Sequence, residues 1–287
     1  MFKWILLAAT ALLPYAVLAA AGPFSLTVYP ESIIQGEPAV VTIVGITATS
    51  SVKKISFDGA PLGLFINQNK VEALIGVDLN KKPGQYILSV QLPGGAKLEK
   101  TISVVERERI KEPFSIPKKL GGNTVQSQKT LVSTLAAENA SLANIFTGTK
   151  AFWKSAFGWP LEKITVTDTY GYSRETGAYS IAHKGTDFRA AEGTKVLAIN
   201  RGVVRIAKTY RNYGKTIVVD HGLGLMSFYM HLSKIKVAAG QLVVPGQVIG
   251  LSGQTGYAEQ PHLHLTVRIN GTSIDPMKFF ERINTKR

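Results

Sequence analysis

Short apolar runs separated by glycine- and proline-rich turns recur through most of this chain, and no other feature constrains its fold as strongly. In one run Tyr86, Leu88, Val90 and Leu92 alternate with polar or small neighbours, which is the pattern of a half-buried strand. The strands expected between residues 23 and 107 are Leu26–Tyr29, Val40–Val44, Val52–Phe57, Val71–Val77, Gln85–Leu92 and Thr101–Val105. Their number and spacing predict a small β-sandwich.

Residues 164–280 show the same pattern, so the predicted fold class is mainly β. The expected strands there are Lys195–Ile199, Val203–Ala207, Thr216–Val219, Met226–Tyr229 and Leu263–Ile269. We interpret the charged, proline-containing connector over residues 106–122 as a solvated linker. From Thr124 to about Phe146 the apolar residues take helical spacing, and this helix is expected to pack on the following domain or to cross to the first.

The predicted organisation has four parts. Residues 1–21 form an export signal, residues 23–107 a β domain, residues 108–160 a linker with a helix, and residues 161–287 a second β domain.

The first 21 residues have the pattern of a secretory signal peptide. Lys3 precedes an apolar run that ends in three alanines, which are typical of a cleavage site. We expect cleavage after Ala21, with Ala19 as the alternative. The run is near the minimum length for crossing a bilayer, so an uncleaved membrane anchor is the competing interpretation, which Pro14 disfavours.

The chain contains no cysteine, and its 33 Lys and Arg against 19 Asp and Glu give a formal net charge of +14. The lack of cysteine excludes disulfide scaffolds, thiolate zinc fingers, iron–sulfur clusters and cysteine nucleophiles, so any metal must bind His, Asp or Glu. The basic excess indicates an anionic partner: nucleic acid, a membrane surface or a cell-wall polymer. Without residues 1–21 the net charge is +13, and export argues against nucleic acid.

All five histidines lie within the last 105 residues. His262 and His264 open an apolar strand, and both imidazoles can reach one point because residues i and i+2 share a face. His183 precedes Asp187 by four residues, and a turn at Gly185 can fold the histidine back toward the carboxylate. His183, Asp187 and His264 together offer three ligands and one open position, as catalytic zinc sites do.

The two remaining histidines have different interpretations. A histidine taken alone is more often a core or surface residue than a ligand. His231 follows an alternating strand and is a candidate base or electrostatic stabiliser beside the site. His221 lies at a glycine-rich turn, and we interpret it as structural.

In this order the motifs resemble the lysostaphin-type, LytM-like zinc metallopeptidases, which hydrolyse peptide bonds in peptidoglycan. The resemblance runs from about Ile164 to Phe280 and includes TDTYGYSR, HKGTDFRAAEGTKVLAINRGVV, VVDHGLGLMSFYMHLS, VVPGQVIGLSGQTG, HLH and IDP. It implies an antiparallel β catalytic domain. Upstream, QGEPAVVTIVG and KPGQYILSV resemble bacterial immunoglobulin-like modules, and the whole arrangement is similar to that of exported members from diderm bacteria.

Residue by residue, the resemblance implies one zinc ion per chain, held by His183, Asp187 and His264, and two catalytic histidines, His231 and His262. One of the two catalytic histidines would take a proton from a zinc-activated water. The other would stabilise charge or protonate the leaving amine, and the assignment of the two roles stays open.

Two stretches depart from the family pattern. Glu259-Gln260-Pro261 stands where many relatives have Thr-Gly-Pro, and Leu265-Thr266 stands where an aromatic residue and a glutamate often follow. Neither departure removes a ligand, so both bear on the substrate groove and not on the metal.

The predicted function is therefore an exported zinc metalloendopeptidase that hydrolyses peptidoglycan cross-links, with the periplasm as its expected location. Stem peptides and cross-links are the expected partners, and a membrane tether is expected only if the signal is uncleaved. Two alternatives are a non-catalytic peptidoglycan-binding regulator of other wall hydrolases and a zinc protease that acts on proteins. The upstream region has three open roles: binding wall, inhibiting the enzyme by covering its groove, or spacing.

Overall fold

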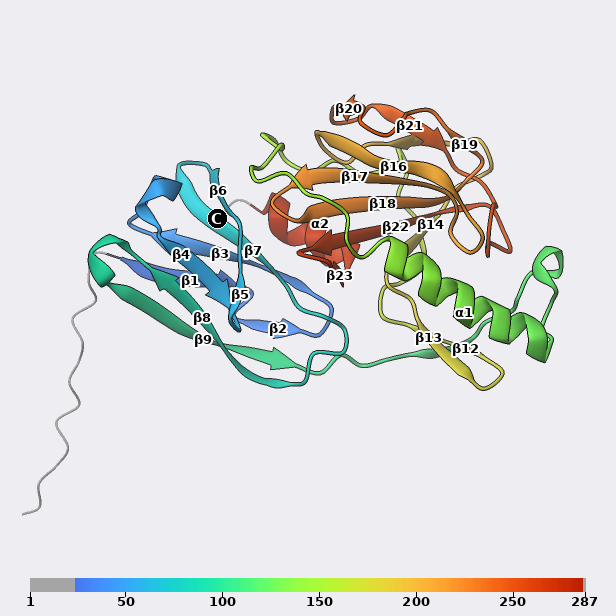
Figure 1. The fold of residues 1–287 in the computed structure, drawn as a ribbon, viewed down its shortest axis with the longest axis horizontal. Helices are drawn as coiled ribbons and strands as arrows, with labels where there is room; N and C mark the ends of the chain where they lie inside the picture. Colours follow the sequence, from blue (N-terminus) through green and yellow to red (C-terminus); the bar gives the residue numbers. More distant parts are fainter. Residues whose placement is uncertain (1–23, 286–287) are drawn as a thin grey trace, which may run out of the picture.

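The computed structural model describes residues 24–285, and the predicted signal peptide over residues 1–21 lies outside this range. A mainly β fold is confirmed: an N-terminal pair of sheets is followed by a larger antiparallel sheet (Figure 1). Within residues 24–285, no helix is both long enough and apolar enough to cross a membrane.

The N-terminal region is a sandwich of two sheets. The first has the order β1 (Ser25–Tyr29), β3 (Pro38–Val44), β7 (Lys70–Gly76) and β6 (Leu64–Asn67). The second has the order β2 (Ser32–Ile34), β9 (Lys97–Val105), β8 (Gly84–Gln91), β4 (Lys54–Phe57) and β5 (Ala60–Pro61). Each of the six expected strands is present, and the immunoglobulin-like topology stays a prediction.

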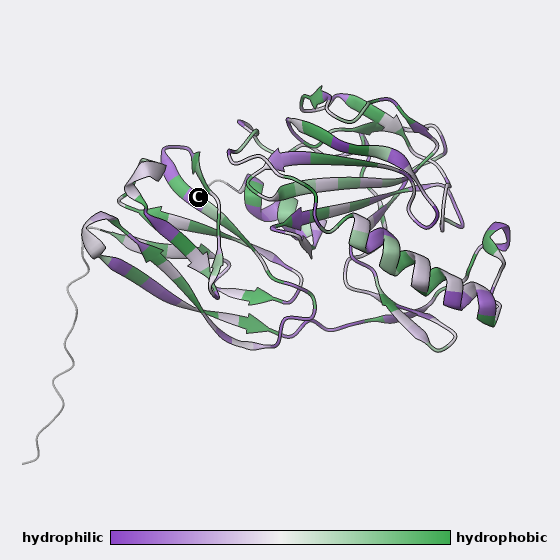
Figure 2. Cartoon of the chain, viewed as in Figure 1, coloured by the Kyte–Doolittle hydropathy of each residue, from purple (hydrophilic) through white to green (hydrophobic). Residues whose placement is uncertain are grey.

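Alternation along the strands builds the core of this sandwich. In β8, Leu88 and Val90 are fully buried between the sheets, as the sequence predicts. Hydrophobic and hydrophilic residues accordingly interchange along the strands in Figure 2. β3 differs because Val41 faces the sandwich core while Val40 packs into the core of the C-terminal region. The first sheet is therefore covered on both sides.

The C-terminal region is built on one large sheet and one small one. The large sheet has the order β11 (Val166–Asp168), β14 (Thr186–Arg189), β22 (His262–Ile269), β18 (Leu225–Leu232), β17 (Gly214–Gly222), β16 (Gly202–Tyr210) and β20 (Leu242–Val243), with β23 (Thr272–Ile274) paired to β22. The small sheet has the order β15 (Lys195–Leu197), β21 (Val248–Leu251) and β19 (Lys234–Ile235). Helix α2 (Pro276–Asn284) follows, and Figure 1 shows it beside the sandwich.

The connector is not simply a solvated linker, which corrects that part of the sequence interpretation. β10 (Lys111–Pro113) pairs with β12 (Ser173–Thr176), which pairs with β13 (Tyr179–Ala182), so the connector completes a three-stranded sheet. Short 3-10 turns occur at Thr49–Ser51, Pro93–Gly95 and Lys118–Leu120.

Helix α1 spans Val125–Ser141 and ends before the expected boundary near Phe146. The Thr124 hydroxyl caps its first turn by accepting a hydrogen bond from the Ser127 amide at 3.2 Å. Leu131 packs with Tyr257 of the C-terminal region, so the helix packs on the following domain, one of the two expected arrangements.

A buried ionic network joins the sandwich to the C-terminal region. Glu37, which precedes β3, pairs with Arg282 of α2 and lies 3.4 Å from Arg107 of the connector. Arg107 also lies 3.2 Å from Asp275, which caps α2. All four side chains are at most 16% exposed, so these charges are paired in a largely dry interface.

Candidate metal centre and active site

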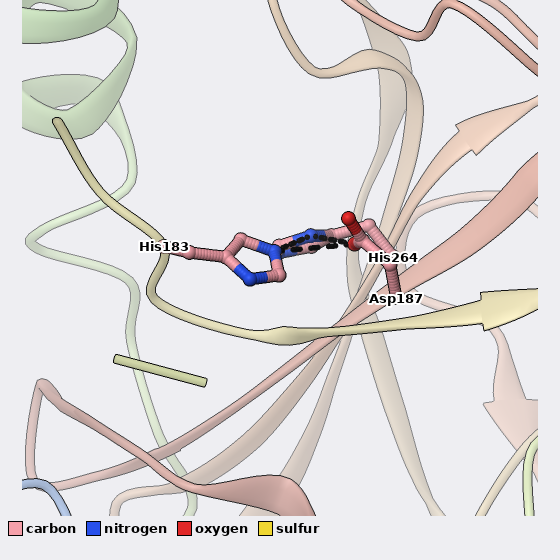
Figure 3. A group of neighbouring side chains, drawn as sticks. All are labelled: His183, Asp187 and His264. Atoms are coloured by element: carbon pink, nitrogen blue, oxygen red, sulfur yellow. Dashed lines mark hydrogen bonds and ion pairs between the residues drawn. The ribbon is translucent and has the colours of Figure 1, made fainter. Parts of the chain in front are cut away.

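Two neighbouring strands and one turn bring His183, Asp187 and His264 together. Asp187 on β14 lies directly opposite His264 on β22 in the antiparallel register. His183 comes from the turn before β14 (Figure 3). This turn passes so close to the sheet that a Cβ at Gly185 would overlap the His264 ring. Glycine is therefore required here to let His183 reach the other two side chains.

The candidate ligand atoms of these three residues lie close enough together to reach one metal ion. Asp187 Oδ1 lies 2.7 Å from His264 Nδ1 and 3.2 Å from His183 Nε2, and the two ring nitrogens are 3.0 Å apart. Ligands about 2.0–2.1 Å from a tetrahedral zinc would be about 3.3 Å apart. The donor set and its spacing therefore fit a metal ion such as zinc.

The tautomers of both histidines follow from their other ring nitrogens. His183 Nδ1 lies 2.8 Å from the Thr169 carbonyl, which can only accept, so this nitrogen carries the hydrogen and Nε2 has a free lone pair. His264 Nε2 lies 2.9 Å from the Thr266 hydroxyl, which itself donates to the Lys184 carbonyl. His264 therefore presents Nδ1 to the site.

Burial and charge keep this cluster in the form that binds metal. Burial alone would raise the pKa of Asp187, but His183 and His264 outweigh it and hold this pKa well below its ordinary range. Burial lowers the pKa of His264 to about 4, against the opposing effect of Asp187. At neutral pH Asp187 is thus a carboxylate and the His264 ring is neutral, which are the protonation states that metal ligands need.

His231 and His262 lie beside the three candidate ligand residues. The His231 ring centroid is 4.9 Å from that of His262 and 6.0 Å from that of His264. Each has Nδ1 against a backbone carbonyl, Thr255 at 2.9 Å and Gln260 at 2.8 Å respectively, so Nε2 is the free basic nitrogen.

The environment of His231 suits a base. Burial, followed by the neighbouring His262 and His264, holds the pKa of His231 well below its ordinary value, so the ring is neutral. Its backbone is left-handed with a φ of 61°, a conformation that is rare outside glycine and that clusters at functional sites. A strained backbone at this position is consistent with a functional constraint on the ring.

His221 lies apart from this group. Its ring is fully buried, with Nδ1 2.8 Å from the Arg201 carbonyl and Nε2 2.8 Å from the Ser227 hydroxyl. Burial lowers its pKa to about 4. These contacts agree with the structural interpretation of His221.

A cavity of about 380 Å³ opens onto the site. His183, His231 and His264 line one side of it, and Leu131 and Leu135 of α1 line another. The connector helix therefore forms part of the wall of the cavity that leads to the candidate metal ligands.

Sequence reasoning missed the roles of three side chains at the site. Arg174 donates to Asp187 Oδ2 at 2.7 Å and also pairs with Asp168. Arg174 and Asp168 lie in the stretch TDTYGYSR, which resembles the family but offers no ligand to the metal. The sequence signal that could have identified them is an aspartate and an arginine six positions apart, shortly before the H-x-x-x-D pair. Thr266 was noted only as a departure from the family pattern, although it holds the His264 ring.

Three ligand residues around one point, two further imidazoles and an open cavity on an antiparallel sheet define a metallopeptidase-type site. Residues 181–276 match Peptidase family M23, and the C-terminal domain of this chain belongs to that family, in its lysostaphin-type, LytM-like group.

The matches to two curated relatives cover between a third and two fifths of this chain. The chain is 44% identical over 96 residues to the peptidoglycan DD-endopeptidase ShyA of Vibrio cholerae, which is 33% of this chain and 22% of that protein. It is 37% identical over 124 residues to lysostaphin of Staphylococcus staphylolyticus, which is 39% of this chain and 25% of that protein. The chain thus matches about a quarter or less of the length of these two relatives.

One solved structure resembles nearly the whole chain. A candidate M23 peptidase from Pseudomonas aeruginosa has 27% sequence identity and a TM-score of 0.64, over 88% of this chain and 96% of that chain. The similarity extends beyond the matched family domain, so the upstream region is part of a shared fold.

Proposed function

We propose that this chain is an exported zinc metalloendopeptidase that hydrolyses peptide cross-links of peptidoglycan. The observation that carries the proposal is the meeting of His183, Asp187 and His264, whose ligand atoms lie within 4.8 Å of one another, beside two further imidazoles. The names of relatives such as peptidoglycan DD-endopeptidase ShyA support the substrate class.

We propose one zinc ion per chain, held by His183 Nε2, Asp187 Oδ1 and His264 Nδ1. A donor set of two imidazoles and one carboxylate suits zinc, and these three side chains leave a fourth position open. Zinc bound there would supply a water of near-neutral pKa and polarise the scissile carbonyl.

The two free Nε2 atoms of His231 and His262 supply the proton transfers. Both rings are held by backbone carbonyls at Nδ1, so each presents a basic nitrogen in a fixed direction. One accepts a proton from water as it attacks the peptide carbonyl, and the other stabilises the developing charge or protonates the leaving amine. His262 is the more exposed of the two, with 17% of its side chain accessible, whereas His231 is buried.

Metal content and products test the proposal together. The purified chain should contain about one zinc, and mass spectrometry of digested peptidoglycan should show cross-linked muropeptides converted to monomers. His264→Ala should lose both metal and activity, because one ligand is removed. His231→Ala should keep the metal while hydrolysis falls by about 100-fold or more.

Each other result selects a different function. Full activity of the His231→Ala variant would contradict a catalytic role for His231. Zinc binding without any bond cleavage would favour a non-catalytic regulator, and cleavage of unfolded proteins with no release from peptidoglycan would favour a protease. The muropeptide masses also identify the bond, where D-Ala–diaminopimelate is expected for a diderm host and Gly-Gly for another wall type.

We propose a periplasmic location, supported by the signal pattern over residues 1–21. Its removal leaves a net charge of +13 on the exported part, which suits an anionic wall polymer. N-terminal sequencing of the chain recovered from the periplasmic fraction tests this, and an intact Met1 in the membrane fraction would indicate an uncleaved anchor.

For the upstream region we propose inhibition by covering of the groove. Support comes from α1, whose Leu131 and Leu135 line the same cavity as the metal ligands. The Glu138 carboxylate anchors this helix by accepting hydrogen bonds from the amides of Asn212 at 3.0 Å and Tyr213 at 3.3 Å. A cross-linked peptide would then require the helix to move before it reaches the site. Wall binding and simple spacing are the alternatives.

A further inference from the structure

Arg174 connects a strand outside the large sheet to the candidate metal centre. It lies on β12, the middle strand of the three-stranded sheet that the connector completes. Its Nη2 donates to Asp187 Oδ2 at 2.7 Å, and its Nε donates to Asp168 Oδ2 at 3.1 Å. The side chain of Arg174 is 21% exposed and that of Asp187 is 8% exposed, so the pair is shielded from bulk water.

The two oxygens of Asp187 have separate partners. Oδ1 faces the ring nitrogens of His183 and His264, at 3.2 Å and 2.7 Å, whereas Oδ2 is taken by Arg174. An aspartate with one oxygen held in this way cannot rotate to offer both oxygens to a metal. Charge-assisted hydrogen bonds from a guanidinium are strong and directional, which makes the restraint effective.

We propose that Arg174 is a positioning residue that holds Asp187 as a one-oxygen ligand and thereby sets the metal affinity. The inference rests on the proposed metal site. Partners of metal ligands orient the ligand and raise affinity, and their loss typically costs 10- to 100-fold in metal binding.

The connector in turn holds Arg174. Glu112 on β10 lies opposite Arg174 in the parallel register, and the Phe114 amide donates to the Glu175 carbonyl at 2.8 Å. The Phe114 ring lies 5.4 Å from the Arg174 guanidinium carbon, within the range of a cation–π contact. The upstream segment that covers the cavity thus also supports the metal ligand through one arginine.

The test compares zinc affinities of the metal-free full-length chain, measured by competition with a chromogenic chelator. Arg174→Gln removes the charge and should weaken zinc binding by about 10- to 100-fold. Arg174→Lys keeps the charge but loses the planar fork, so its affinity should fall between those of Arg174→Gln and the unsubstituted chain. Phe114→Ala should weaken binding less than Arg174→Gln.

Arg205→Gln is the matched control. Arg205 pairs with the buried Asp220 at 2.6 Å, and its side chain is 23% exposed, yet it lies in a separate ion pair. This variant should lower thermal stability and leave zinc affinity unchanged. Zinc affinity of Arg174→Gln within twofold of the parent chain, or tighter, would overturn the inference. A parent chain that binds no zinc would instead overturn the proposed function.

Discussion

At the scale of the residue, each histidine of the site directs one ring nitrogen into the site, while its other ring nitrogen contacts a backbone carbonyl or a hydroxyl. His183 is held by the Thr169 carbonyl, His264 by Thr266, and His231 by the Thr255 carbonyl. The free nitrogens converge because the bound ones fix each ring. Backbone carbonyls provide most of these restraints, so they are encoded by the fold and not by residue type.

His221 provides a prediction on pH that does not involve the metal ligands. Its pKa is about 4 in the folded chain and about 6.5 when unfolded, so between these values the unfolded chain binds more protons. The contribution of His221 to the free energy of unfolding is therefore fully present above pH 6.5. It is lost as the pH falls toward 4, by about 3 kcal/mol in total. Urea unfolding of the metal-free chain at several pH values measures this loss.

The control for that measurement is His221→Gln, which cannot titrate. Its free energy of unfolding should be lower at neutral pH because two buried contacts change. Its dependence on pH between 6.5 and 4.5 should be shallower than that of the unsubstituted chain. Parallel curves would show that His221 titrates normally.

The pairing of His262 with His264, and of His183 with Asp187, was predictable because strand periodicity and a glycine turn are local properties. The role of Arg174 was not predictable, since its contact with Asp187 depends on how the sheet of β10, β12 and β13 lies relative to β14. A charged residue in a short polar segment is usually solvated, so the sequence context of Arg174 favoured no role.

At the scale of the element, the two sides of α1 have different environments. Its exposed side carries Lys129 and its other side carries the buried Leu131 and Glu138. A buried carboxylate on a helix needs partners, and the amides of Asn212 and Tyr213 provide them. The helix is thus anchored by a few polar contacts and a small apolar cluster, which makes it easier to detach than a strand of the sheet.

Glu138→Ala tests whether this helix limits access. The substitution leaves two buried amides without an acceptor and should weaken the docking of α1 by about 1–3 kcal/mol. Hydrolysis of purified peptidoglycan should increase several-fold while zinc content stays the same. Lys129→Ala on the exposed side of the helix should leave the rate unchanged. An equal or lower rate for Glu138→Ala would contradict inhibition by α1.

The elements were predictable where they are long. The strand pattern identified β3, β7, β8, β17, β18 and β22, which carry both cores. β10, β12 and β13 were missed because they span only three or four residues, and β10 and β12 are rich in polar side chains. Such strands form only because tertiary packing brings them together, so the local sequence has no periodicity that predicts them.

At the scale of the whole molecule, the sandwich and the C-terminal region share one core. Val40, Phe65 and Leu74 of the sandwich pack into the C-terminal core, and the Phe65 ring contacts Trp153 with centroids 5.1 Å apart. The near-continuous apolar run of β3 is explained by this arrangement, because both of its faces are covered. The sequence predicted the strand, but not that its outer face would be buried.

Glu37→Ala tests how firmly the two parts are joined. It removes the carboxylate that pairs with Arg282 in the interface, and breaking such a buried pair typically costs about 3–5 kcal/mol. Calorimetry should then resolve separate unfolding transitions for the two parts. Glu281→Ala is the control, because its pair with Lys278 on the same helix is exposed and should contribute less than about 1 kcal/mol. A small, equal effect of both substitutions would indicate a loosely held sandwich.

Arg282, one of the two arginines that Glu37 contacts, lies 245 residues further along the chain, in α2. During synthesis the sandwich is complete, with its own core, long before that partner exists. Until α2 is made, the outer face of β3 exposes Val40, and the Glu37 carboxylate lacks Arg282. A nascent or interrupted chain therefore displays an apolar strand face that the finished chain hides. This difference gives chaperones and proteases a physical basis for distinguishing the two.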